Sequence, residues 1–212
     1  GNYVPKPFYI EADWSAASYY YAVAVLAEAA SIELKGLTNQ QIQGDAVIAS
    51  IANSFGVETT WKENAVEIRK ISKPDISVFD FDFLECPDLA QTVVAFCAAL
   101  NIELHCKGLQ TLRIKETDRI AALDTELQKL GLASLVELDS KNWQLISNKL
   151  TTYNSRLTTI KTYDDHRMAM AFAPLVLKLN ELVIEDANVV SKSYPLFWKD
   201  LEKLGFEITT AI

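Results

Sequence analysis

Apolar residues fill three long runs of the chain, and each run directly follows an aspartate. The runs are apolar on nearly every helical face, which predicts buried helices near 14–30, 89–100 and 166–179. The preceding Asp13, Asp88 and Asp165 suit the N-cap position, and Gln91 completes a capping-box pattern with Asp88. Because a helix without a polar face is covered on all sides, we expect sheets to surround these three helices.

A second set of helices is predicted by amphipathic segments that each end at a glycine. The segments are 44–55, 116–130 and 193–204, followed by Gly56, Gly131 and Gly205. A glycine suits the left-handed position just after a helix. Strand-like segments lie between and after the helices, at 8–12, 31–37, 57–61, 65–71, 101–109, 133–138, 143–147, 181–187 and 206–210. They predict hairpins after the first two amphipathic helices and a single strand after the third.

These elements recur with a period of about 75 residues. The three aspartates are spaced by 75 and 77 residues, and the three glycines by 75 and 74. A fixed period with the same order of elements indicates an internally repeated architecture. Alternation of helices and strands favours the α/β class. We therefore expect one domain over 1–212 with repeated units at roughly 8–72, 78–148 and 157–212.

Composition narrows the class of protein. Half of the 212 residues are hydrophobic, and the net charge of −8 argues against a nucleic-acid surface. The longest apolar run, 16–30, is too short to span a membrane. Three cysteines show no metal spacing, and Cys97 lies in an apolar run typical of a buried thiol. We expect a cytoplasmic protein, and we interpret the start at Gly1-Asn2 without Met as either a vector remnant or the cut end of a longer chain.

Basic residues gather where the predicted helices begin. Lys115, Arg119, Arg167 and Lys192 lie at these starts, where free amides and the helix dipole favour anions. This pattern predicts a site for phosphate or carboxylate groups. Each basic residue alone is equally typical of a surface ion pair, and the i,i+3 spacing of Glu116 and Arg119 allows them to pair with each other.

Four segments carry a resemblance to a known family. LRIKETDRI (112–120), YDDHRMAMAF (163–172), SKSYP (191–195) and EADWSAASYY (11–20) resemble the C-terminal half of 5-enolpyruvylshikimate-3-phosphate synthases, the 3-phosphoshikimate 1-carboxyvinyltransferases. The resemblance runs from about Tyr9 to the C-terminus. It implies an inside-out α/β barrel domain of three βαβαββ units with buried parallel helices, as in enolpyruvyl transferases. It also implies a partner domain, the N-terminal domain of the same enzyme, which has no counterpart in this chain.

The resemblance implies a reaction and roles for individual residues. The reaction is transfer of the enolpyruvyl group of phosphoenolpyruvate to the 5-hydroxyl of shikimate 3-phosphate, with release of phosphate. Asp88 resembles the base and a shikimate 3-phosphate contact, Glu116 the group that moves the methylene proton, and Lys115 a shikimate 3-phosphate contact. Thr111 stands where many members carry an asparagine that touches this phosphate.

The remaining roles concern phosphoenolpyruvate. By resemblance, Arg119, Arg167 and Lys192 bind it, and further residues fall beside the site, namely Asp13, Asp165 and His166. We interpret His166 as a packed or solvated side chain rather than a metal ligand. The resemblance implies no metal and no organic cofactor, and we expect a monomer.

Two alternatives remain open at this point. One is the related UDP-N-acetylglucosamine enolpyruvyl transferase, and the other is a non-catalytic anion-binding domain. Because half of the active site is missing, we expect the chain alone to be inactive. We also expect six principal site residues to be open to solvent, with a net local charge of +2. They are Asp88, Lys115, Glu116, Arg119, Arg167 and Lys192. Replacing Arg119 or Arg167 by alanine should then barely change stability.

Overall fold

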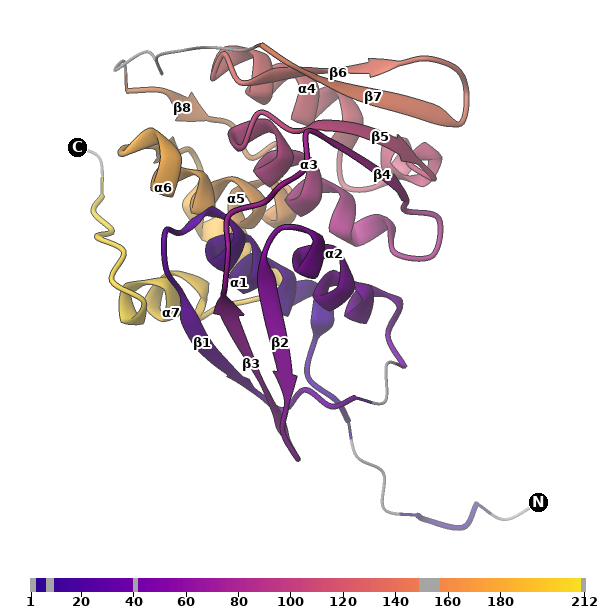
Figure 1. Cartoon of the computed structure of the whole chain (residues 1–212), viewed down its shortest axis with the longest axis vertical. Helices are drawn as coiled ribbons and strands as arrows, with labels where there is room; N and C mark the ends of the chain where they lie inside the picture. Colours follow the sequence, from indigo (N-terminus) through magenta and orange to yellow (C-terminus); the bar gives the residue numbers. More distant parts are fainter. Residues whose placement is uncertain (1–2, 7–9, 40–41, 149–156, 211–212) are drawn as a thin grey trace.

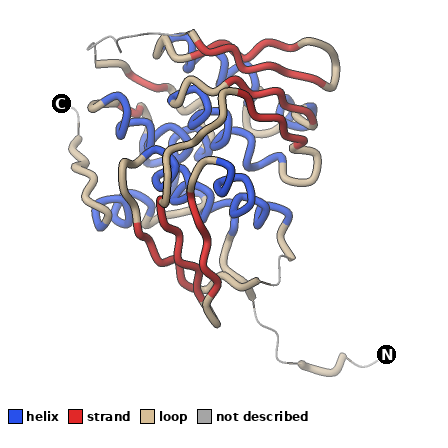
Figure 2. The backbone as a smooth tube through the Cα atoms, in the orientation of Figure 1, coloured by secondary structure: helices blue, strands red, loops and turns tan. Residues whose placement is uncertain are grey.

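The computed structural model describes residues 3–6, 10–39, 42–148 and 157–210. Helices occupy the middle of the molecule and strands lie toward its outside (Figure 1). The strands form three separate sheets, coloured red in Figure 2. Each sheet draws its strands from one of three consecutive segments of the chain. The described residues include no helix with the length and apolarity needed to cross a membrane.

The first segment contains a three-stranded antiparallel sheet in the order β1-β3-β2. Its elements are α1 (Trp14–Leu26), β1 (Ser31–Lys35), the 3-10 helix η1 (Gly44–Val47), α2 (Ile48–Ser54), β2 (Val57–Trp61) and β3 (Ala65–Lys70). The predicted hairpin is confirmed by the antiparallel pairing of β2 with β3. The predicted strand at 8–12 lies partly outside the described residues, and 10–12 belong to no strand.

The second segment has the full βαβαββ order. Its elements are β4 (Val78–Asp82), η2 (Pro87–Leu89), α3 (Ala90–Ala99), β5 (Glu103–Lys107), η3 (Gln110–Ile114), α4 (Arg119–Lys129), β6 (Ala133–Glu137) and β7 (Asn142–Ser147). The sheet order is β4-β5-β7-β6, with β4 parallel to β5 and the β6–β7 hairpin antiparallel. The parallel crossover places α3 against the inner face of this sheet.

The third segment is shorter in strands. Its elements are β8 (Thr159–Ile160), α5 (His166–Phe172), η4 (Ala173–Leu175), α6 (Val176–Leu179), β9 (Val183–Ile184), η5 (Ala187–Lys192) and α7 (Phe197–Lys203). β8 and β9 pair in parallel. The single predicted helix over 166–179 is interrupted at η4, where Pro174 has no amide to donate. The predicted strand at 206–210 is wrong, because these residues pair with no strand in the described structure.

Burial on all sides is confirmed for α1 and α3 but is wrong for the end of the third predicted helix, because α6 contains no buried residue. All ten residues of α3 are buried, and α1 is buried except for Ser15 and Ala16 at its start. The hydroxyls of Ser18 and Thr92 lie 3.3 Å apart where α1 meets α3. Each fully buried valine or leucine contributes about 1.5–3 kcal/mol relative to exposure. The helices therefore form the core, although α1 ends at Leu26, four residues before its predicted end.

Glycines end the amphipathic helices as predicted. Gly56, Gly131 and Gly205 have φ of +77°, +71° and +93°, in the left-handed region. At Gly56 a Cβ atom would lie 2.2 Å from the carbonyl oxygen of Ser72. A side chain is therefore excluded at this position by both conformation and space. This glycine turns the chain from α2 into β2.

Candidate functional site

The starts of the buried helices differ in how their aspartates are used. Asp13 accepts from the amides of Ser15 (2.8 Å) and Ala16 (3.2 Å), and Asp165 accepts from the amide of Arg167 (2.9 Å). The N-cap prediction is therefore confirmed for these two. It is wrong for Asp88, because the 3-10 turn η2 precedes α3 and Leu89 takes the N-cap position.

The capping box predicted for Gln91 is wrong for the same reason. Its side chain is fully buried within α3, and neither its amide nitrogen nor its oxygen has a hydrogen-bond partner in the described structure. Asp88, which would have been its partner at the cap, makes no cap hydrogen bond. The carboxylate of Asp88 is consequently available for other contacts.

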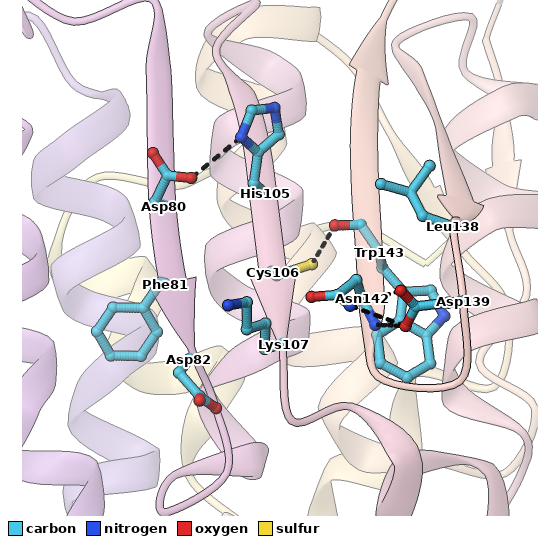
Figure 3. Close-up of a pocket in the computed structure, with 10 residues that line it drawn as sticks. All are labelled: Asp80, Phe81, Asp82, His105, Cys106, Lys107, Leu138, Asp139, Asn142 and Trp143. Carbon is cyan, nitrogen blue, oxygen red and sulfur yellow. Dashed lines mark hydrogen bonds and ion pairs between the residues drawn. The ribbon is translucent and has the colours of Figure 1, made fainter.

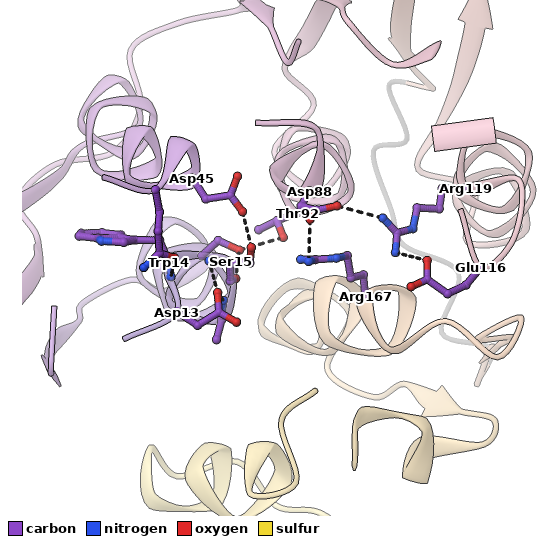
Figure 4. A network of polar contacts seen from close by, with 12 residues as sticks. Asp13, Trp14, Ser15, Asp45, Asp88, Thr92, Glu116, Arg119 and Arg167 are labelled. Carbon is purple, nitrogen blue, oxygen red and sulfur yellow. Dashed lines mark hydrogen bonds and ion pairs between the residues drawn. The ribbon is translucent and has the colours of Figure 1, made fainter. Parts of the chain in front are cut away.

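Asp88 lies between two arginines (Figure 4). Its Oδ1 accepts from the guanidinium of Arg119 at 3.1 Å, and its Oδ2 accepts from Arg167 at 2.8 Å. Hydrogen bonds in which both partners are charged are roughly twice as strong as neutral ones. The two arginines therefore orient both oxygens of the candidate base.

Arg119 is enclosed by carboxylates from three different elements. Besides Asp88, its Nε donates to Asp165 Oδ2 at 2.6 Å and its other terminal nitrogen donates to Glu116 at 2.6 Å. The side chain of Arg119 is 2% exposed and that of Asp165 is 0% exposed. The expectation that Arg119 is open to solvent is wrong. Burial of its charge is compensated because the surrounding carboxylates pair with it.

Arg167 is also more enclosed than expected, with its side chain 14% exposed. One of its terminal nitrogens donates to Asp88, and the other lies 3.5 Å from the hydroxyl of Tyr19. Burial raises the pKa of Tyr19 to about 12, although the nearby Arg167 opposes this shift. Tyr19 therefore remains a neutral hydroxyl at physiological pH and supports the guanidinium of Arg167.

The other three principal residues lie toward solvent. Lys192 Nζ donates to the carbonyl of Asp164 at 3.0 Å and to its carboxylate at 2.5 Å. Glu116 has a side chain that is 43% exposed, and Lys115 is exposed without a hydrogen-bonding or ionic partner in the described structure. The expected exposure is therefore confirmed for Lys115, Glu116 and Lys192.

We call the contacting set of Asp88, Glu116, Arg119, Asp165 and Arg167 the arginine network. It holds two guanidinium groups and three carboxylates, a formal net charge of −1. The expected net charge of +2 counted Asp88, Lys115, Glu116, Arg119, Arg167 and Lys192; the network lacks Lys115 and Lys192 and includes Asp165. The sequence count treated Asp165 as a neighbour, whereas the structure places its buried carboxylate directly on Arg119.

Local interactions shift several pKa values near the network. A backbone hydrogen bond and the nearby Arg119 lower the pKa of Glu116 despite some desolvation. Burial lowers the pKa of His166, whose Nδ1 has no hydrogen-bond partner in the described structure. Glu116 is therefore ionised and His166 neutral at pH 7.

Sequence reasoning missed Asp45, which lies on the other side of Asp88 from Arg119 (Figure 4). The hydroxyl of Ser15 donates to its carboxylate. Burial raises the pKa of Asp45, and the negative charges of Asp88 and Asp13 add to this effect. Asp45 lies in η1, at the start of the second helical element of the first segment. The period of 75 residues places it opposite Ile120, one residue after the KETDR motif, so the repeat pointed to this helix start but not to Asp45 itself.

A pocket lies elsewhere on the molecule. It has a volume of about 630 Å³ and is formed by β4, β5, β7 and the β6–β7 turn (Figure 3). Within it, His105 Nδ1 lies 3.0 Å from Asp80, and its Nε2 lies 2.7 Å from Glu103. No residue of the arginine network lines this pocket. Within the described ranges, no group of three or more His, Cys, Asp or Glu side chains is arranged to hold a metal ion.

Comparison with protein families gives a match over nearly the whole chain. Residues 1–201 match the model of the family described as EPSP synthase (3-phosphoshikimate 1-carboxyvinyltransferase). The chain belongs to the EPSP synthase family. A 3-phosphoshikimate 1-carboxyvinyltransferase of Bacteroides fragilis (strain YCH46) is 46% identical over 203 residues, covering 95% of this chain and 48% of that protein. One from Syntrophobacter fumaroxidans is 34% identical over 195 residues, covering 92% and 44%.

Solved structures agree on the fold. The EPSP synthase of Acinetobacter baumannii superimposes with a TM-score of 0.72 at 18% identity, over 92% of this chain and 46% of that one. The enolpyruvyl transferase NikO from Streptomyces tendae gives a TM-score of 0.58 at 16% identity, over 94% and 44%. The inside-out α/β fold expected for enolpyruvyl transferases is thereby confirmed. The chain spans about half the length of the curated EPSP synthase relatives it matches.

Proposed function

We propose that this chain forms one half of an enzyme that transfers the enolpyruvyl group of phosphoenolpyruvate to the 5-hydroxyl of shikimate 3-phosphate. The observation that carries the proposal is the position of Asp88 between Arg119 and Arg167. A base for a hydroxyl proton and two cations for an anionic substrate thereby lie in one network. Chemistry between a hydroxyl and a phosphorylated carboxylic acid requires this combination.

The proposed reaction is an addition followed by an elimination. Asp88 accepts the proton of the 5-hydroxyl group while the oxygen of that hydroxyl forms a bond to C2 of phosphoenolpyruvate. Glu116, which is ionised in the chain without substrate, enters this step in its protonated form and delivers the proton to the methylene carbon, which becomes a methyl group. In the elimination, the bond from C2 to the phosphate oxygen breaks, and a methyl proton returns to Glu116. The proton that Asp88 accepted leaves with the phosphate, so both carboxyl groups return to their starting states. The products are 5-enolpyruvylshikimate 3-phosphate and phosphate.

The cations have complementary roles in this proposal. Arg119, Arg167 and Lys192 bind the phosphate and carboxylate of phosphoenolpyruvate, and Lys115 contacts shikimate 3-phosphate. Carboxylates of the chain occupy the guanidinium groups of Arg119 and Arg167, so in this proposal a substrate carboxylate or phosphate replaces one of these partners. Thr111, exposed in η3, offers a hydroxyl in place of the asparagine amide of many members.

Residues beside the site orient these groups rather than react. Asp165 holds Arg119, and Asp13 caps α1. His166 is neutral and begins α5. We further propose a cytoplasmic location, which is supported by three buried cysteines that are all free thiols.

A second half of the enzyme supplies the rest of the site in this proposal. Proximity of reactants held between two sets of groups provides much of an enzyme's rate. We therefore predict that the chain alone releases no phosphate from phosphoenolpyruvate and shikimate 3-phosphate. Turnover by the purified chain, measured by phosphate release without any added partner, would contradict the proposal of a divided site.

The role of Asp88 is tested in the full-length enzyme. Asp88→Asn retains the size of the side chain but removes its ability to accept a proton, so kcat should fall about 10²–10⁴-fold. Substrate binding, followed by calorimetry, should change much less. Asp139→Asn, in the turn between β6 and β7 and outside the arginine network, serves as the matched control. Unchanged kcat in Asp88→Asn would refute its assignment as the base.

A further inference from the structure

Two consecutive residues immediately before α5 have a left-handed backbone. Tyr163 has φ of +56° and Asp164 has φ of +58°. This conformation is unfavourable for residues that carry a Cβ atom, and such residues persist only where surrounding contacts hold them. We call Tyr163 and Asp164 the left-handed pair. Their contacts show what holds them and what they hold in turn.

Glu126 of α4 anchors the segment that leads into the left-handed pair. Its carboxylate is 0% exposed and accepts from the hydroxyl of Tyr163 at 2.7 Å and from the backbone amide of Lys161 at 3.3 Å. Lys129 Nζ lies 2.5 Å from the same carboxylate. Desolvation and the bond to Glu126 raise the pKa of Tyr163 to about 12. The hydroxyl therefore keeps its proton and donates to Glu126.

The other end of the left-handed pair contacts candidate substrate-binding cations. The carbonyl and carboxylate of Asp164 both accept from Lys192. The next residue, Asp165, caps α5 and accepts from Nε of Arg119. A change in the backbone of the pair would therefore move the partners of both Lys192 and Arg119.

Helix α4 contacts this segment at two points on one face. Arg119 and Glu126 are seven residues apart, which is close to two helical turns, so both side chains project from the same side of α4. Both are buried, with Arg119 1% and Glu126 0% exposed. Arg119 holds Asp165 after the left-handed pair, and Glu126 holds the residues before and within it. The pair is thus fixed from both ends by one rigid element.

We propose that Glu126 is a positioning residue for the candidate active site. Through Tyr163 it keeps the left-handed pair in place, and this sets where Asp164 and Asp165 present their carboxylates to Lys192 and Arg119. The proposal rests on the proposed function insofar as these two cations bind phosphoenolpyruvate. The positioning itself depends only on the contacts described here.

The test begins with the 212-residue chain. Tyr163→Phe removes one hydroxyl, and Glu126→Gln retains the shape of the side chain but removes its charge. The matched control is Tyr21→Phe, which removes a buried hydroxyl bonded to Thr59 at 3.0 Å, in the first segment. Solvent exchange of the Arg119 Nε–H, measured by NMR, should become at least tenfold faster in the first two variants and stay unchanged in the control. Exchange within twofold of the unaltered chain in both variants would overturn the proposal, even if their melting temperatures fall.

A second measurement separates this proposal from the proposed function. In the full-length enzyme, Tyr163→Phe and Glu126→Gln should raise the KM for phosphoenolpyruvate at least tenfold and the KM for shikimate 3-phosphate by less than threefold. Tyr21→Phe should change neither. If exchange at Arg119 accelerates but the KM for phosphoenolpyruvate does not change, positioning by Glu126 stands and the assignment of Arg119 and Lys192 to this substrate fails.

Discussion

Replacing Arg119 by alanine should strongly destabilise the domain. The guanidinium is 2% exposed and pairs with Asp165, whose side chain is 0% exposed. Without Arg119, the carboxylate of Asp165 would stay buried with only the amide of Arg167 at 2.9 Å as a hydrogen-bond donor. The structure thus reverses the expectation, drawn from sequence, that this substitution would be nearly neutral.

The size of the effect follows from the buried charge that remains. Removing one partner of a buried ion pair typically costs about 3–5 kcal/mol. For a chain of this length, each kcal/mol lowers Tm by about 2–4 °C, so Tm should fall by about 6–20 °C. Combining Arg119→Ala with Asp165→Asn removes the uncompensated charge and keeps a side chain able to cap α5. The double variant should therefore recover a large part of the lost free energy of unfolding.

The assay is urea unfolding followed by circular dichroism. Arg69→Ala is the matched control, because Arg69 pairs with Glu58 in an ion pair whose side chains are 60% and 48% exposed. Exposed pairs contribute about 0–1 kcal/mol, so this control should scarcely change the midpoint. A loss below about 1 kcal/mol for Arg119→Ala, or a double variant no more stable than the single one, would refute the assignment of Arg119 and Asp165 as a buried pair.

Three further predictions concern the core, a histidine and the arginine network. Val94→Asp should destabilise the chain by more than about 4 kcal/mol, because position 94 is 0% exposed and an aspartate there would have an unpaired charge. A cooperative unfolding transition with the same midpoint as the unaltered chain would contradict this. Hydrogen bonds to the carboxylates of Glu103 and Asp80 raise the pKa of His105. Its stabilising contribution is therefore complete below the unfolded-state pKa of about 6.5 and is lost as pH rises through the folded-state pKa, so His105→Gln should flatten the change in Tm between pH 6 and 8. Glu116→Gln frees Arg119 from one competing carboxylate, so NMR titration should show tighter binding of inorganic phosphate, and weaker binding would contradict this competition.

Local patterns in the sequence were sufficient to predict much of the fold. All-round apolar runs identified α1 and α3 as buried, since a helix without a polar face avoids water on every side and these runs are too short to span a membrane. The glycine positions and two aspartate caps depend on a few adjacent residues, and the structure confirms them. The third helix is interrupted at a single residue, Pro174. The sequence pattern did not predict this, because Pro174 lies within an otherwise continuous apolar run.

The candidate site was only partly predictable, because its contacts join distant segments. The i,i+3 pairing of Glu116 with Arg119 was foreseen as an alternative, and the structure contains it at 2.6 Å. Burial of Arg119 requires Asp88 and Asp165, which come from two other helix starts. In sequence a charged motif such as KETDR is typical of an exposed turn. Its enclosure follows from tertiary packing, which the local pattern does not encode.

The 3-10 turn before α3 has a consequence for redesign of the fold. Asp13 and Asp165 stabilise their helices by accepting hydrogen bonds from backbone amides. The 3-10 turn at Pro87 shifts the start of α3, so Asp88 does not cap that helix. A designer who made the three repeats identical, by converting this turn into a regular capped helix, would improve helical regularity. The same change would direct the carboxylate of Asp88 toward backbone amides and away from the two arginines. The irregular start of α3 is therefore what leaves the carboxylate of one of three equivalent aspartates free to contact side chains from the other repeats.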